Sequence, residues 1–284
     1  QNLIARPTLS INQRNEALLE LGHDYMSAGL LDRAENLFQE LCDTDAYIIP
    51  ALRQVIDLYE QEKDWDQAIT SARRLAKVTG ENLGGVIAHY YCEKAENALL
   101  GGHHMQALQF TRQALDTAPN CVRASLLEGD IEAKSGNHEA AISSFRKVEL
   151  QDPDFLPEVV PRFQASFEQL NRKPEAVDYL NGLVERHGVI SATLAVAAMK
   201  KENEGTGEAV RFLSERLRDK PSARGLEYLL KLKEDEGGDS DHLTMIKILT
   251  TELMESGPDY KCGHCGFPAR FLHWQCPACK HWNT

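Results

Sequence analysis

Small and apolar residues recur through most of the chain at the three- and four-residue spacing of amphipathic helices. The same arrangement returns at a longer and nearly constant interval. Six alanines hold equivalent places, at intervals of 34, 39, 34, 35 and 33 residues: Ala34, Ala68, Ala107, Ala141, Ala176 and Ala209. Such a period is typical of helical hairpins that stack on one another, because one hairpin cannot bury its own apolar face. The chain is therefore predicted to be a solenoid of α-helical hairpins.

The first unit contains the residue types that a closely packed hairpin needs. Leu21, Gly22 and Tyr25 are followed by Ala34 and Phe38, which is the pattern of a tetratricopeptide repeat. Glycine or alanine at the small positions lets the two helices of a hairpin approach closely. We predict an all-α fold in which a tetratricopeptide-repeat superhelical solenoid forms the main part of the chain.

The repeat array is expected to occupy residues 1–257, with about six or seven repeats. The one long interval predicts that five inserted residues lie in the loop at 79–85. A seventh hairpin is expected near the end of the array, with a break between its helices at 237–240. The residues before Asn15 resemble the end of an earlier helix, so the array is expected to begin partway through a repeat.

Stacked hairpins of this kind present a concave surface, formed largely by the first helix of each hairpin, that binds peptides or proteins. Charged and polar residues at the inward positions are the candidates for contact with a partner. A helix face that only contacts solvent has the same composition, so these residues are either partner-binding residues or ordinary surface residues. The candidate partner-binding residues are Arg53, Asp57, His89, Arg123 and Asp130.

Two C-x-x-C pairs lie close together at the C-terminal end of the chain: Cys262 with Cys265, and Cys276 with Cys279. Two such pairs bring four thiolates to one tetrahedral centre, which suits zinc or iron. Two redox pairs or two disulfides are the alternative. A segment this short cannot form a stable hydrophobic core alone and needs an additional cross-link. This requirement favours a bound metal ion. We predict one tetrahedral ion, Zn²⁺ or Fe²⁺/Fe³⁺, in a small domain at 258–284.

Five aromatic residues are expected to form the small core of this metal domain: Tyr260, Phe267, Phe271, Trp274 and Trp282. Three histidines are possible substitute ligands, but four sulfurs already close the coordination shell, so surface or packing roles are expected for them: His264, His273 and His281. A closed four-sulfur site offers no open position to a substrate, which disfavours hydrolytic metal chemistry.

Charge and composition narrow the class of protein. The 284 residues carry a formal net charge of −12, which argues against nonspecific binding to nucleic acid. Mean hydropathy is −0.41, and no apolar stretch approaches the roughly 18 residues of a spanning helix. The odd number of cysteines and their metal-type pairing favour a reducing compartment.

Motifs of catalysis are missing from the sequence. The glycines at 80–85 are not followed by the Lys-Ser/Thr of a phosphate-binding loop, and neither H-E-x-x-H nor G-x-S-x-G occurs. We therefore expect no catalytic residue and no enzymatic activity.

Helical repeats followed by a rubredoxin-like C-x-x-C-G and C-P-x-C segment form an unusual combination. Together with the stretches at 21–30 and 91–93, it makes the chain resemble the lipopolysaccharide assembly protein B family over essentially its whole length. The metal ligands that this resemblance implies are Cys262, Cys265, Cys276 and Cys279.

The resemblance also implies a function. Members of that family are anchored in the bacterial inner membrane by one N-terminal helix, with repeats and metal domain on the cytoplasmic side. They present the deacetylase LpxC, the committed enzyme of lipid A synthesis, to the membrane protease FtsH, and an inner-membrane regulator restrains them. We therefore expect a non-enzymatic adaptor that attaches to the membrane only through an anchor preceding this sequence.

Two other functions remain open from the residues. One is electron transfer or redox sensing by a rubredoxin-type iron site, and the other is a zinc ribbon that binds nucleic acid, which the acidic repeats disfavour. For the adaptor, the short connection at 255–258 leads us to expect that the metal domain folds back on the last hairpins.

Overall fold

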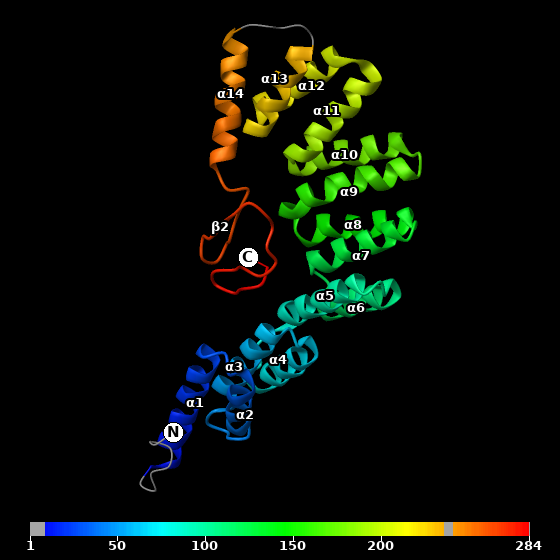
Figure 1. The fold of residues 1–284 in the computed structure, drawn as a ribbon. Helices are drawn as coiled ribbons and strands as arrows, with labels where there is room; N and C mark the ends of the chain where they lie inside the picture. The colour runs from blue at the N-terminus through cyan, green and yellow to red at the C-terminus, as the bar shows by residue number, and fades with distance from the viewer. Residues whose placement is uncertain (1–8, 236–240, 284) are drawn as a thin grey trace. The chain divides into compact units, whose positions relative to one another are not determined.

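The computed structural model describes residues 9–235 and 241–283, and the chain divides within one helix into two compact units, residues 1–124 and 125–284. The first unit contains α1 (Ile11–Ser27), α2 (Leu31–Cys42), α3 (Ile48–Glu62), α4 (Trp65–Thr79), α5 (Gly84–Leu100), α6 (His104–Thr117) and the start of α7 (Val122–Lys134) (Figure 1).

The second unit contains the rest of α7 and all later elements. These are α8 (His138–Gln151), the 3₁₀ turn η1 (Pro153–Phe155), α9 (Leu156–Gln169), α10 (Lys173–His187), α11 (Ile190–Glu204), α12 (Thr206–Asp219), α13 (Ala223–Asp235), α14 (Asp241–Ser256), β1 (Tyr260–Lys261) and β2 (Pro268–Ala269). The predicted all-α tetratricopeptide fold with a small C-terminal metal domain is confirmed.

A left-handed residue separates the two helices of each of the first five hairpins. It lies two residues before the second helix, so the turn recurs with the repeat. The residues and their φ angles are Gly29 (72°), Lys63 (58°), Gly102 (76°), Gly136 (81°) and Asn171 (54°). Glycine and asparagine tolerate this conformation, whereas a lysine adopts it only at a cost in free energy.

Small residues let the helices of a hairpin pack closely, as the sequence predicts. The six alanines that define the period are at most 2% exposed. A Cβ added at Gly22 would lie 2.3 Å from Cε1 of Phe38, and one added at Gly129 would lie 2.2 Å from Cε1 of Phe145. In both hairpins a phenylalanine of the second helix therefore lies directly against the backbone of the first.

The five extra residues of the long repeat interval do not form a loop, contrary to our expectation. The connection from α4 to α5 is no longer than that from α2 to α3, and Gly84 and Gly85 already belong to α5. The extra residues lengthen the helices instead: α4 has 15 residues where α2 has 12, and α5 has 17 where α3 has 15. Glycine is tolerated in a first helical turn, so its presence does not mark a loop here.

The last hairpin pairs α13 with α14, and Lys247 of α14 forms an ion pair of 2.6 Å with Glu234 of α13. The break expected at 237–240 lies outside the described residues, as do residues 1–8. Helix α14 ends at Ser256 and β1 begins at Tyr260, so the boundary proposed at 257/258 falls between them. No helix among the described residues is both long and apolar enough to span a membrane.

Candidate metal centre and partner surface

Two short turns hold the four C-terminal cysteines. β1 and β2 pair antiparallel, with Tyr260 opposite Ala269, and Cys262 N–H donates to the Phe267 carbonyl at 2.9 Å. The second turn repeats this geometry, since Cys276 N–H donates to the His281 carbonyl at 2.9 Å. The residue four places after the first cysteine of each pair is left-handed: Gly266 at φ 77° and Lys280 at φ 59°.

The sulfur atoms have the spacing of a tetrahedral metal site. All four Sγ atoms lie within 4.8 Å of one another. The distance from Cys262 Sγ to Cys279 Sγ is 3.8 Å, and that from Cys265 Sγ to Cys276 Sγ is 3.6 Å. Four sulfurs about 2.3 Å from a central ion stand about 3.8 Å apart, whereas a disulfide requires about 2.05 Å. The thiolate set therefore fits one metal ion, and the geometry opposes the disulfide alternative.

Backbone N–H groups near the sulfurs favour the thiolate form of Cys276, which is the form that a metal requires. Cys265 N–H lies 3.4 Å from Cys262 Sγ. The backbone N–H of Cys279, aided by that of Ala278, holds the pKa of the Cys276 thiol below its ordinary value. Cys262 and Cys276 are buried, while Cys265 is exposed and Cys279 is intermediate. One side of the centre is thus enclosed by protein and the other faces solvent.

Three contacts among the described residues dock the metal domain on the repeats of the second unit. Tyr260 Oη donates to Glu158 Oε1 of α9 at 2.6 Å, which raises the pKa of Tyr260 to about 12. The rings of Trp274 and Phe155 stack with centroids 5.3 Å apart. Asp259 forms an ion pair of 2.7 Å with Arg224 of α13.

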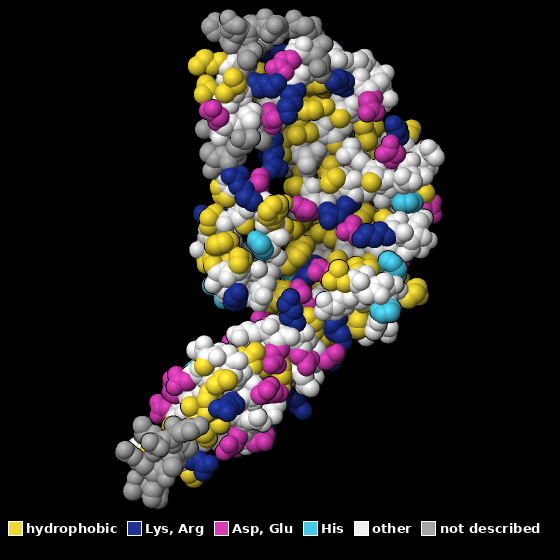
Figure 2. All heavy atoms as spheres, in the orientation of Figure 1, with side chains coloured by type: hydrophobic (Ala, Val, Ile, Leu, Met, Phe, Trp, Pro, Cys, Tyr) yellow, Lys and Arg dark blue, Asp and Glu magenta, His cyan; other side chains and the backbone are white. Residues whose placement is uncertain are grey.

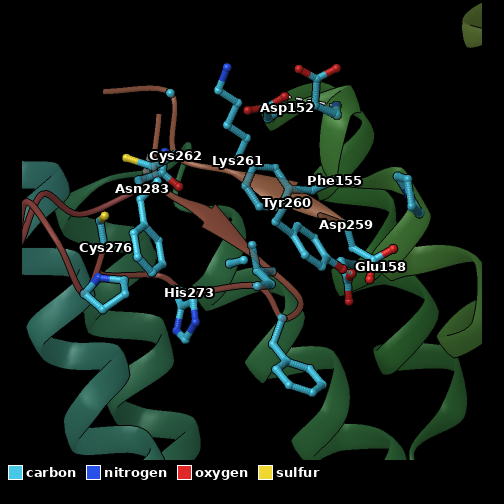
Figure 3. A pocket seen from close by; sticks show the side chains of 18 of the residues that line it. Asp152, Phe155, Glu158, Asp259, Tyr260, Lys261, Cys262, His273, Cys276 and Asn283 are labelled. Atoms are coloured by element: carbon cyan, nitrogen blue, oxygen red, sulfur yellow. Dashed lines mark hydrogen bonds between the residues drawn. The ribbon is translucent and has the colours of Figure 1, made fainter. Parts of the chain in front are cut away.

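The metal domain folds back on the last hairpins, as expected: it contacts α13 of the last hairpin and also η1 and the start of α9, two hairpins earlier. One expectation about the core of the domain is wrong. Phe271 is 76% exposed, so it is not part of the domain's core, in which the best-buried side chains are two of the cysteines. An open cavity of about 490 Å³ remains along the docked face, where Tyr260 points toward Glu158 (Figure 3).

The three histidines of the metal domain are exposed. His264 and His281 nevertheless lie together, with stacked rings whose centroids are 3.7 Å apart. The sequence did not predict this pairing, because the two residues belong to different turns that only the fold brings together.

The candidate partner residues fall into two groups. Arg53 and Asp57 of α3 are exposed, although Arg53 pairs with Glu81 at 2.6 Å. Although the Asp57 residue is exposed, the protein partly desolvates its carboxyl group, and this, followed by the nearby Glu60 carboxylate, raises the pKa of Asp57 to about 6. Asp130 is half-buried and pairs with Arg162 at 3.0 Å. Acidic and basic side chains are interspersed on the face drawn in Figure 2.

His89 and Arg123 do not present open side chains, contrary to our expectation, since each is 4% exposed. Arg123 at the start of α7 reaches back to α5, where it pairs with Glu93 at 2.7 Å and Glu96 at 2.8 Å. Burial, with the charge of Arg123, lowers the pKa of His89 to about 3, so this imidazole is neutral in the folded protein. Both side chains therefore pack between helices and do not form part of the exposed surface of the repeats.

Sequence reasoning missed the docking residues Phe155, Glu158 and Arg224, because nothing local distinguishes them from other helix-surface residues. Cys42, Cys92 and Cys121 are buried, and burial raises the pKa of Cys42. Burial, with the neighbouring Cys121 thiol, raises the pKa of Cys92, and the separation of the two cysteines in sequence did not suggest this proximity.

Two parts of the chain match known protein families. Residues 260–284 match a family described as a rubredoxin metal binding domain, and residues 92–154 match the tetratricopeptide repeat. The chain is similar to solved structures of MamA (16% identity, 66% of this chain and 94% of that one, TM-score 0.39) and of the tetratricopeptide protein YrrB (16%, 63% and 89%, TM-score 0.37). Likeness at this level supports no functional argument.

Curated relatives match the whole chain. It is 30% identical over 287 residues to lipopolysaccharide assembly protein B of Escherichia coli K12, covering 100% of this chain and 74% of that protein. It is 29% identical over 292 residues to the protein of that name from Haemophilus influenzae, covering 100% and 72%. The match includes the repeats and the four-cysteine domain alike. The chain therefore belongs to the lipopolysaccharide assembly protein B family.

Proposed function

We propose that this chain is a non-enzymatic adaptor in the regulation of lipopolysaccharide synthesis. It presents the deacetylase LpxC to the membrane protease FtsH, at the cytoplasmic face of the bacterial inner membrane. The observation that carries the proposal is the match to lipopolysaccharide assembly protein B across the repeats and the metal domain together. Stacked helical hairpins suit this role, since they offer extended surfaces for protein partners and need no catalytic group.

We propose that charged side chains of the first helices contact partners. In the first unit these are the exposed Arg53 and Asp57 of α3, and in the second unit the candidate is the half-buried Asp130 of α7. Desolvation makes the Asp57 carboxylate costly to keep charged, so a cation from a partner would relieve that cost. His89 and Arg123 act through packing within the first unit, where Arg123 pairs with Glu93 and Glu96 of α5. We propose the inner-membrane regulator as a third protein partner. We propose no nucleic-acid partner.

The metal ion, for which we propose zinc, has a structural role. Cys262, Cys265, Cys276 and Cys279 supply four sulfurs, so the shell is closed to substrate. Binding of the ion contributes on the order of 10 kcal/mol to folding of the short domain. The folded domain in turn holds Tyr260 against Glu158 and Asp259 against Arg224, which links two hairpins of the second unit that are not neighbours in the array.

The half-life of the deacetylase in cells depleted of their own family member tests this proposal. The chain is supplied with and without a fused transmembrane helix. If the deacetylase is degraded faster with the anchored chain but not with the unanchored chain, the result supports a membrane-tethered adaptor. Unchanged turnover with both, while the chain is folded and metal-loaded, rules the proposal out.

A Cys265→Ser variant separates the role of the metal domain from that of the repeats. We expect the anchored variant to lose both the metal and the effect on turnover. A Cys42→Ser variant, which changes a buried cysteine outside the metal domain, serves as the matched control and should keep both. Normal turnover with a metal-free Cys265→Ser chain would show that the metal domain is dispensable.

Electron transfer is a second candidate, favoured by one observation. Cys265 is exposed and Cys279 is intermediate, so the sulfur cage has a solvent-facing edge through which an electron could pass. This function requires iron, because zinc does not change its oxidation state. Metal analysis of protein purified from its own host, followed by voltammetry, distinguishes the two candidates.

A further inference from the structure

A second group of metal-binding side chains lies on the exposed side of the four-sulfur centre. It consists of His264 from the first cysteine turn and Cys279 and His281 from the second. One ligand atom of each lies within 4.8 Å of the others. Both imidazoles are exposed, Cys279 is intermediate, and the two rings stack at 3.7 Å with an interplanar angle of 17°.

We propose that His264, Cys279 and His281 form a second cation site that takes a thiophilic divalent ion such as Zn²⁺. Cys279 bridges this ion and the ion of the four-sulfur centre. Imidazole and thiolate are the donors that zinc prefers. A solvent molecule completes the four-coordinate shell, so the site is open where the four-sulfur centre is closed. The proposal adds this site to the structural metal and does not depend on the adaptor function.

The spacing of the donors suits one small ion. At ordinary bond lengths, a tetrahedral zinc ion holds two nitrogens about 3.3 Å apart and a nitrogen and a sulfur about 3.6 Å apart. From at most 4.8 Å, the nitrogens would have to approach each other by up to about 1.5 Å, and a nitrogen and the sulfur by up to about 1.2 Å. Stacked rings must also tilt apart so that their lone pairs converge on the ion. Exposed side chains can make this change by small rotations about their side-chain bonds.

A hydrogen bond already selects the nitrogen that His281 would use. Its Nδ1 lies 3.0 Å from the backbone carbonyl oxygen of Cys279. A carbonyl oxygen only accepts, so a neutral His281 ring that makes this bond carries its proton on Nδ1 and keeps the lone pair of Nε2 for a metal. Metal-bound histidines commonly donate their other N–H to a carbonyl in this way, which fixes the ring and its tautomer.

The charge of the four-sulfur centre itself favours a cation beside it. Four thiolates around one divalent ion leave a net charge of −2, and a bound thiolate sulfur keeps lone pairs that a second ion can use. Cys279 is the cysteine that contributes to both sets of ligand atoms. The excess negative charge is therefore shared directly with the second site.

Cobalt titration of the untagged full chain tests the proposal, because Co²⁺ reports tetrahedral sulfur and nitrogen ligation by its absorption spectrum. In the wild-type chain we expect one equivalent with four-sulfur bands, then a weaker second equivalent that adds a new sulfur-to-cobalt band. His264→Ala/His281→Ala should weaken the second event on the order of tenfold or more and leave the first unchanged. His273→Ala removes another exposed histidine of the domain and serves as the matched control.

Three results would overturn the proposal. The first is a wild-type chain that shows only one event with excess cobalt. The second is a second event that persists unchanged in the double variant. The third is a double variant with a weakened first event, which would make these histidines substitute ligands of the four-sulfur centre. Zinc content after equilibrium dialysis gives the same comparison without relying on spectra.

Discussion

Replacement of Gly22 by alanine tests how closely the helices of a hairpin pack. The added Cβ would lie 2.3, 2.6 and 3.0 Å from three ring carbons of Phe38. Carbon atoms in contact prefer about 3.5–4.0 Å, so the ring or a helix must move by about 1 Å. Phe38 is completely buried, and overpacking of this kind costs about 1–3 kcal/mol. Alanine regains about 1 kcal/mol through its helix propensity, which leaves a net loss of about 0–2 kcal/mol and a difference of about 1–3 kcal/mol from an alanine that meets no neighbour.

Urea unfolding of the metal-loaded chain, followed by circular dichroism, measures this loss. Gly85→Ala is the matched control, since a Cβ at that helical glycine meets nothing within 4 Å. The control should be neutral or stabilising by up to about 1 kcal/mol. Phe38→Leu provides the second half of a double-mutant cycle, because the smaller side chain makes room for the new methyl group. The double variant should therefore lose less free energy of unfolding than the sum of the two single variants.

Equal stability of Gly22→Ala and Gly85→Ala would refute this reasoning. It would mean that the hairpin can open at no cost, so the small residue would not be required for packing. Additive losses in the cycle would place the cost of Gly22→Ala somewhere other than the contact with Phe38.

Three further predictions concern other parts of the structure. Lys63→Gly should raise the free energy of unfolding, measured in urea, by about 0.5–1 kcal/mol, because glycine adopts the left-handed turn without strain. Gly29→Lys, at the same place in the first hairpin, should lower the free energy of unfolding in the same assay. His89 is neutral when folded, with a pKa of about 3, whereas the unfolded side chain takes up a proton below about pH 6.5. Wild type should therefore lose about 2 kcal/mol more than His89→Gln between pH 7 and pH 5, and equal losses would contradict this. Tyr260→Phe removes the bond to Glu158 and should weaken docking by about 1 kcal/mol; hydrogen exchange at 260–283 should then quicken while α1 to α6 stay unchanged.

The repeats could be predicted from the sequence because their packing depends on residues at fixed spacing. Ala34 and its equivalents must be small wherever two helices touch, so the requirement appears in every unit. Cysteine spacing was equally informative, since each C-x-x-C pair forms its own turn. The site for the five extra residues was not predictable in this way, because Gly84 and Gly85 suit a loop and a first helical turn alike.

Long-range packing set the limit of prediction from the sequence. Tyr260 and Glu158 are 102 residues apart, and neither carries a local mark of the contact. Phe271 is aromatic, which suggested a core position, yet the cysteine turns leave it exposed. Arg123 stands at an inward position of its helix, but the carboxylates of Glu93 and Glu96 from α5 bury it, and only the folded chain brings these groups together.

Delivery of the deacetylase to the protease is tested most directly with purified components. FtsH is reconstituted in proteoliposomes, and the degradation rate of purified LpxC is measured with and without this chain, carried on a fused transmembrane helix and loaded with metal. We expect the anchored chain to accelerate degradation several-fold, and the Cys265→Ser variant to have no effect. An unchanged rate with the folded, metal-loaded and anchored chain would contradict the proposal that it is a degradation adaptor.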